Sequence, residues 1–281
     1  MAGGNDTNEA RGGDLVRRHR LSTRLWHWLN AATLLVLLMS GLMIFNAHPR
    51  LYWGAYGANR DPAWLQIGST TQGQSFLRVG TVSVETTGVL GVWADDSGKV
   101  KRRAFPGWAT IPSTYSLSDA RRWHLAFAWV LALALGAYQI WSLLNGHIRR
   151  DLHLTRREWR PSHIWKDVKD HARLRFPTGV AALKYNVLQK LAYVGVIFVL
   201  LPLMIVTGLA MSPGTDAWAP LVTELFGGRQ TARSIHFIAA FALVAFSLIH
   251  MIMVVLAGPI NEVRSMITGR YRLPAEKGDE A

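Results

Sequence analysis

Two histidines lie in one long apolar stretch near the end of the chain, Arg233 to Gly258. His236 and His250 are fourteen residues apart. That separation is roughly 21 Å of helix rise and places both residues within roughly 40° of one helical face. The stretch is long enough to cross a bilayer, and ionisable residues inside a membrane span mark functional sites. The spacing therefore predicts one helix with an imidazole near each membrane surface, as a ladder of two cofactors would require.

The composition is typical of a protein that crosses a membrane several times. Half of the 281 residues are hydrophobic, and the charged residues lie outside a few long apolar runs. The chain has no cysteine, which excludes disulfides, thiolate metal sites, cysteine-ligated iron–sulfur clusters and covalent c-type haem. A redox centre must therefore use histidine or methionine. The net charge of +13 comes from basic residues beside apolar runs, as the positive-inside rule expects, so we expect no nucleic-acid partner.

Four apolar runs predict an all-α membrane protein, a four-transmembrane-helix bundle with a small β-containing extracytoplasmic insertion. The expected spans are residues 25–45, 123–144, 187–211 and 233–258, with a kink at Pro202 in the third. Three basic segments are expected on the cytoplasmic side: residues 1–24, the loop 146–186 and the tail 259–281. Both termini would then be cytoplasmic. Within the loop, we expect a short amphipathic helix near 161–173 on the membrane surface.

The insertion is residues 46–119, between the first two spans. Runs rich in β-branched residues at 76–84 and 89–93, a D-D-S-G turn and a returning strand at 99–105 predict a small β-hairpin. Long loops cross the membrane with little regard to charge, so we expect an extracytoplasmic cap. Its aromatic residues would lie over the outer cofactor, which predicts a docking surface for a partner. The alternative is a self-contained lid.

On this topology the four span histidines form two pairs of equal depth. His124 and His236 lie near the outside, whereas His27 and His250 lie near the cytoplasm. Facing helices of a bundle can hold a cofactor between inward side chains, and two imidazoles fill both axial positions of a b-type haem. A zinc site would need three or four ligands around one ion. We therefore predict two haem b groups, with these four histidines as the iron ligands.

Three of these histidines follow an arginine by three residues: Arg24, Arg121 and Arg233. This spacing places each arginine on its histidine's face, one turn nearer the membrane surface, where it could pair with a haem propionate. The alternative is an interfacial, snorkelling arginine. Gly41 lies fourteen residues after His27, at the depth of the outer haem, where a missing side chain would let the macrocycle approach. Ordinary helix packing is the alternative for Gly41.

The other six histidines lie in loops or at their edges, and we expect them to be solvated. They are His19, His48, His147, His153, His163 and His171. The alternative for His147 and His153 is a position near the inner haem or a quinone.

Several motifs resemble those of the di-haem cytochrome b membrane subunits of bacterial formate dehydrogenase, nickel–iron hydrogenase and thiosulfate reductase. They are R-L-W-H-W at 24–28, R-S-I-H at 233–236 and S-L-I-H at 247–250. F-P-G-W-A-T-I-P-S at 105–113 and R-R-W-H-L-A-F-A-W at 121–129 are most similar to the thiosulfate reductase branch. The resemblance covers about 15–275. It implies that residues 25–258 form a di-haem cytochrome b domain with the four span histidines as ligands.

The resemblance also implies a function. Subunits of this family anchor an extracytoplasmic oxidoreductase, often one that contains molybdopterin, in the bacterial inner membrane, and pass electrons between that enzyme and the quinone pool. The chain would then be an electron-transfer subunit, in contact with membrane lipid, rather than a catalyst alone. A quinone site is expected near the inner haem, and position alone suggests Asn30, Tyr185 and Lys190 for it.

Two other functions remain open at this point. One is a stand-alone membrane haem reductase of a small extracytoplasmic acceptor such as a ferric chelate, which would be active without a partner. The other is a haemless anchor or transporter whose histidines move protons, which would give a colourless preparation.

Overall fold

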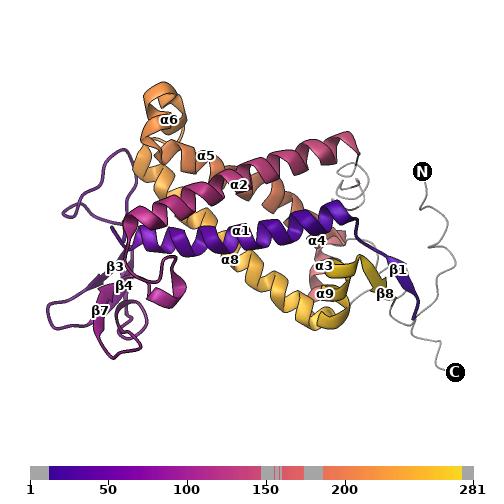
Figure 1. The fold of residues 1–281 in the computed structure, drawn as a ribbon, viewed down its shortest axis with the longest axis horizontal. Helices are drawn as coiled ribbons and strands as arrows, with labels where there is room; N and C mark the ends of the chain where they lie inside the picture. The colour runs from indigo at the N-terminus through magenta and orange to yellow at the C-terminus, as the bar shows by residue number, and fades with distance from the viewer. Residues whose placement is uncertain (1–12, 147–154, 156–157, 159, 174–185, 274–281) are drawn as a thin grey trace. The chain divides into compact units, whose positions relative to one another are not determined.

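The computed structural model of the protein describes residues 13–146, 155, 158, 160–173 and 186–273 (Figure 1). Within it the chain divides into two compact units. The first unit comprises Met1–Leu29, Leu135–Leu200 and Leu243–Ala281, and the second comprises Asn30–Ala134 and Leu201–Ala242.

Four helices are long and apolar enough to cross a membrane, as predicted. They are α1 (Leu21–Phe45), α2 (Leu117–Leu144), the helical run Val187–Met211, and α8 (Arg229–Ala257). Three of them begin four to six residues before the expected span, because helical hydrogen bonding continues through the polar residues that flank an apolar run. At the start of α2, for example, the Ser116 hydroxyl accepts a hydrogen bond from the Asp119 N–H at 3.3 Å.

The third span is irregular in its middle. It consists of α4 (Val187–Gly195), the π-helical turn η4 (Val196–Leu200) and α5 (Leu201–Met211). In π geometry the carbonyl of Ile197 would accept from residue 202, but Pro202 has no N–H. The side-chain amide of Gln139 on α2 donates to that carbonyl instead, at 3.0 Å. The irregularity expected at Pro202 is therefore present as a π turn directly before it.

In the first unit the two ends of the described chain lie side by side (Figure 1). Strand β1 (Leu15–Arg17) pairs antiparallel with β8 (Arg270–Arg272). Arg18 forms an ion pair of 2.9 Å with Glu262 of α9 (Pro259–Thr268). The guanidinium of Arg18 also lies 4.4 Å from the ring centroid of Tyr271. Hydropathy did not predict this pairing, because the two strands are separated by most of the chain.

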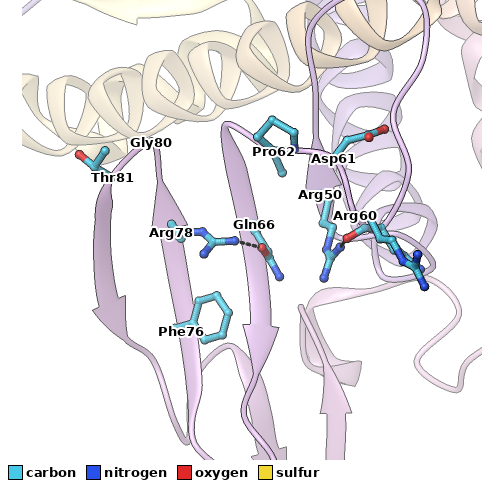
Figure 2. Close-up of a pocket in the computed structure, with 11 residues that line it drawn as sticks. Arg50, Arg60, Asp61, Pro62, Gln66, Phe76, Arg78, Gly80 and Thr81 are labelled. Atoms are coloured by element: carbon cyan, nitrogen blue, oxygen red, sulfur yellow. Dashed lines mark hydrogen bonds between the residues drawn. The ribbon is translucent and has the colours of Figure 1, made fainter.

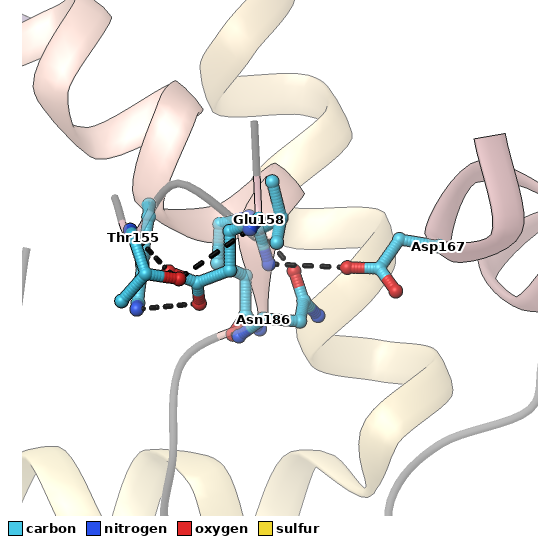
Figure 3. A network of polar contacts seen from close by, with 7 residues as sticks. Thr155, Glu158, Asp167 and Asn186 are labelled. Atoms are coloured by element: carbon cyan, nitrogen blue, oxygen red, sulfur yellow. Dashed lines mark hydrogen bonds and ion pairs between the residues drawn. The ribbon is translucent and has the colours of Figure 1, made fainter. Parts of the chain in front are cut away.

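The predicted short amphipathic helix is also confirmed, as α3 (Pro161–Ala172). The Asp167 carboxylate accepts a hydrogen bond of 3.1 Å from the backbone N–H of Val187, which anchors α3 to the first turn of α4 (Figure 3). Nearby, Lys190 forms an ion pair of 2.8 Å with Glu158. Burial raises the pKa of Glu158, but hydrogen bonds from Lys190 and Thr155 outweigh burial and lower this pKa to about 2.

In the second unit the insertion is more extensive than the single hairpin predicted. It contains an antiparallel sheet of order β2-β3-β4-β5 and a separate hairpin, β6-β7. The strands are β2 (Arg50–Leu51), β3 (Leu65–Ser69), β4 (Ser75–Val79), β5 (Val82–Glu85), β6 (Gly91–Ala94) and β7 (Val100–Arg103). The predicted hairpin corresponds to β6-β7. The β-branched run at 76–84 forms two strands, β4 and β5, because Gly80, at φ 58°, turns the chain between them.

The insertion shares a hydrophobic core with the transmembrane helices of its unit. Buried Leu51, Leu65 and Ile67 of the sheet pack with Phe45 at the end of α1, and Phe237 of α8 packs against the same cluster. The insertion is therefore a folded part of the second unit, and its core includes Phe237, the residue next to His236 on α8.

Two histidine pairs as candidate cofactor sites

Each unit contains one pair of facing histidines. In the first unit, His27 of α1 and His250 of α8 have ring centroids 6.3 Å apart and ring planes at 57°. In the second unit, His124 of α2 and His236 of α8 also have ring centroids 6.3 Å apart, with ring planes at 60°. The structure thus brings together the two pairs expected from the sequence. Below, they are the first-unit pair and the second-unit pair.

The separation of 6.3 Å fits a metal ion between the rings. An imidazole nitrogen binds a metal ion at about 2 Å, so two rings on opposite sides of one ion have centroids about 6 Å apart. A direct N–H···N hydrogen bond of about 3 Å would bring the centroids roughly 1 Å closer. Among the described residues, no group of three or more His, Cys, Asp or Glu could hold a metal ion. This donor set fits an ion whose other ligands come from a macrocycle.

A threonine of the third span orients His236. The Oγ1 atom of Thr207 lies 2.9 Å from Nδ1 of His236. The Thr207 hydroxyl donates its own proton to the Leu203 carbonyl at 2.6 Å, so its oxygen accepts from His236 Nδ1–H. That hydrogen bond selects the tautomer with the lone pair on Nε2, the nitrogen then available to a metal ion.

Ser40 holds His124 in the same way. The Oγ atom of Ser40 lies 3.1 Å from Nδ1 of His124, and its hydroxyl donates to the Val36 carbonyl at 2.7 Å. Ser40 and Thr207 are both completely buried. Both rings of the second-unit pair therefore have a fixed tautomer, with the lone pair on Nε2, where a metal ion could bind.

A glycine follows each of these hydroxyl residues and makes room for the imidazole. A Cβ atom on Gly41 would lie 3.4 Å from Cε1 of His124, and one on Gly208 would lie 3.7 Å from Cε1 of His236. The expectation for Gly41 concerned the macrocycle, whereas the structure places this glycine against the imidazole itself. Gly208 was not predicted. The signal available in the sequence was a repeated dipeptide, S-G at 40–41 and T-G at 207–208.

The first-unit pair has a different environment. Nδ1 of His27 is buried and has no hydrogen-bond partner among the described residues. The rings around the pair are aromatic: Trp28 meets His27 edge-on with centroids 5.2 Å apart, and Phe246 stacks on His250 at 5.9 Å. A buried nitrogen without a partner is rare in proteins, and His27 therefore lacks the hydroxyl partner that each ring of the second-unit pair has.

Comparison with known proteins identifies the family. The family model described as prokaryotic cytochrome b561 matches residues 18–269. The chain belongs to this family. It is therefore a multi-pass membrane haem protein of the b type, as the motif resemblance implied.

One curated relative is similar over half of the chain. It is the "Putative protein-methionine-sulfoxide reductase subunit YedZ1" of Azospira oryzae, 32% identical over 142 residues, which cover 50% of this chain and 67% of that protein. No solved structure matches the chain.

In this b561-family protein the three motif arginines have different surroundings. Arg24 donates to the carbonyl of Ile267, and its buried Nε has no partner among the described residues. Arg233 donates to the carbonyl of His48 at 2.6 Å. Arg121 is exposed. A guanidinium has five N–H donors, so Arg24 and Arg233 keep donors for another acceptor, and their role toward a propionate stays a prediction.

Three of the remaining histidines are half-buried rather than solvated, in contrast to the expectation: His19, His48 and His163, whose Nδ1 is buried without a hydrogen-bond partner among the described residues. His19 is half-buried, and burial, followed by the charge of Arg18, lowers its pKa to about 4. His48 is also half-buried and lies with Nε2 3.2 Å from the Tyr52 hydroxyl oxygen. His19 and His48 lie just outside the two ends of α1, in polar segments whose composition does not predict burial. The predicted positions His147, His153 and Tyr185 lie outside the described residues.

Proposed function

We propose that this chain is a di-haem cytochrome b subunit that transfers electrons between the quinone pool and an extracytoplasmic oxidoreductase, a molybdopterin enzyme. The observation that carries the proposal is that two histidine pairs have the same separation between ring centroids, 6.3 Å. His27 and His250 would hold one haem b, and His124 and His236 the other. Haem b, when bound, supplies one-electron transfer.

The ligand set favours electron transfer over substrate chemistry. If two imidazoles held each iron, they would leave no open coordination position for a substrate, so the chain alone would not be a catalyst. Ser40 and Thr207 support this role, because rings with a fixed tautomer need little rearrangement when charge changes at the centre. The curated relative, named as a reductase subunit, supports a partner oxidoreductase for this chain as well.

Charge and the placement of the histidines support the proposed orientation. The segments rich in Lys and Arg would face the cytoplasm of a bacterial inner membrane. The insertion 46–119 and the second-unit pair would then be on the opposite side, toward the partner, with the first-unit pair toward the quinone. Helix α8 carries one histidine of each pair, so both sites share one helix. Lys190, a positional candidate for the quinone site, already forms an ion pair with Glu158.

Haem content of the purified full-length chain tests the proposal. The reduced protein should have a b-type spectrum with two haems per chain. His124→Ala should remove the second-unit haem and spare the other, and His27→Ala should do the reverse. His163→Ala is the control and should keep two. One haem per wild-type chain, or none, would refute the assignment. Quinol-dependent reduction of both haems in membranes would support the quinone link, and reduction of neither would contradict it.

A further inference from the structure

A row of polar residues crosses the sheet of the insertion. Arg50 on β2 lies opposite Gln66 on β3, and Gln66 lies opposite Arg78 on β4. Directly opposed residues project from the same face with Cβ atoms about 4.5–5.5 Å apart. Two guanidinium groups therefore flank one amide on this face, while Leu51 and Leu65, the next residues along their strands, are buried in the core on the other face.

This row lies in a pocket with a volume of about 800 Å³ (Figure 2). A third guanidinium, that of Arg60, comes from the loop between β2 and β3. The pocket has one carboxylate, that of Asp61, and this group already accepts a hydrogen bond of 2.7 Å from the Ala58 N–H. Within the described part of the chain, none of the three arginines forms an ion pair. The pocket therefore has an excess of positive charge.

Two of the guanidinium groups are held in place before any ligand binds. Arg78 donates to the Oε1 atom of Gln66, which is itself buried, and Arg50 donates to the carbonyl of Asn59 (Figure 2). Each of these contacts uses one of five N–H donors. The remaining donors can bind carboxylates, in the paired geometry that arginine favours.

Within the described residues, the sheet also has an unpaired edge beside this pocket. Strand β5 is last in the strand order, and all four of its residues are exposed, with Val82 at 65% and Val84 at 57%. Gly80 and Thr81, in the turn that leads into β5, line the pocket. An edge strand with no further partner offers its backbone N–H and C=O groups to an added strand. A segment paired with β5 would lie two strands, roughly 10 Å, from β4, and by continuing past the turn at Gly80 and Thr81 it would enter the pocket of the arginines.

We propose that this arginine pocket and the β5 edge bind an extended acidic segment of the partner oxidoreductase. The inference deepens the proposed function, because it assigns the docking site of that partner to a defined part of the insertion. The pocket volume of about 800 Å³ is larger than a small oxyanion needs and lies within the range of pockets that bind larger ligands. The edge strand supplies backbone hydrogen bonds, the arginines supply charge complementarity, and exposed valines suit an alternating acidic and apolar sequence.

Binding of a peptide to the full-length chain in detergent tests the proposal. The probe is a fluorescently labelled Glu-Val octapeptide of alternating sequence, with the Lys-Val octapeptide as the charge-reversed control. We expect saturable binding of the Glu-Val peptide that weakens as salt rises. Arg60→Gln combined with Arg78→Gln should weaken it at least tenfold. Arg102→Gln removes an exposed arginine of β7 outside the pocket and should stay within twofold.

Three results would overturn the proposal. They are no saturable binding by the wild-type chain, an equal loss in Arg102→Gln, and binding of citrate as tight as that of the peptide, which would indicate a small-anion site. Val84→Glu, which adds a like charge to the edge, should also weaken binding, and unchanged binding would remove β5 from the site. Haem content measured on the same samples separates the two proposals, because two haems per chain without peptide binding refutes only the docking site.

Discussion

The hydroxyl oxygen of Thr207 lies 2.9 Å from Nδ1 of His236 and gives its own proton to the carbonyl of Leu203. The third span, which carries none of the paired histidines, thereby orients a residue of α8. Ser40 does the same for His124 from α1. The second-unit pair thus depends on side chains from all four spans, with two supplying imidazoles and two supplying hydroxyl groups.

Thr207→Val should weaken the second-unit haem site. Valine keeps the shape of threonine but removes the hydroxyl that accepts from His236 Nδ1–H, so that only the Met204 carbonyl remains as an acceptor; losing one hydrogen bond costs about 0.5–1.5 kcal/mol. Loss of such an outer partner typically lowers metal affinity by about 10–100-fold. We therefore expect reduced haem content, measured as haem per chain after stringent washing. Thr207→Ser keeps the hydroxyl and should retain the haem; an equal loss in both variants would refute the orienting role.

The haem that Thr207→Val retains should have a raised midpoint potential. An acceptor on Nδ1–H makes the imidazole more basic and favours the oxidised iron, so its removal favours the reduced iron. For the same reason, the second-unit haem of the wild-type chain should have a lower midpoint potential than the first-unit haem, because His27 Nδ1 has no acceptor among the described residues. Redox titration with optical detection measures the midpoint potentials of both haems. Equal potentials for the two haems of the wild-type chain, or a second-unit potential that Thr207→Val leaves unchanged, would contradict this expectation.

Gly208→Leu should remove the second-unit haem. The new side chain would enter the space against Cε1 of His236, where even a Cβ atom lies at contact distance, and would turn the ring away from His124. Gly136→Leu is the matched control, because a Cβ atom on Gly136 meets nothing within 4 Å. We expect one haem per chain in the first variant and two in the control. Two haems in Gly208→Leu would show that the glycine is not needed for the ring position.

The ion pair between Glu158 and Lys190 should make stability depend on pH in acid. The pKa of Glu158 is lowered from 4.5 to about 2, so its stabilising contribution is complete above pH 4.5 and is lost as pH falls toward 2. We expect a contribution on the order of 1–2 kcal/mol. The protection of the first turn of α4 against hydrogen exchange, corrected for the intrinsic rate at each pH, should therefore fall over this range in the wild-type chain. Glu158→Gln should show the low protection at every pH, and a profile equal to that of the wild type would contradict the assignment.

The ion pair between Arg18 and Glu262 should hold the N-terminal strand against β8. Both side chains are largely buried, and Glu262→Gln would leave the guanidinium without its charge partner. We expect cleavage by trypsin near residues 17–24 to become several-fold faster. Arg122→Gln breaks an ion pair with exposed Asp119 and should leave the cleavage rate unchanged. Equal rates in wild type and Glu262→Gln would show that strand pairing alone holds the segment.

Hydropathy, charge and histidine spacing were sufficient to predict the four spans and the two histidine pairs. The reason is physical: a membrane requires long apolar helices with satisfied backbone groups, and loop charge sorts their ends. His124 and His236 could therefore be assigned to one depth, and His27 and His250 to another, without coordinates. Their role as iron ligands stays a prediction that haem content will test.

Only the tertiary structure decided what surrounds those histidines. Ser40 and Thr207 occur in apolar helices where a hydroxyl can bond to its own backbone, and the sequence does not say which neighbouring ring they also face. The pairing of β1 with β8 and the register that places Arg50 and Arg78 on either side of Gln66 are contacts between segments that are separate in the chain. Local patterns predict helices and turns, whereas such partners depend on how distant segments pack.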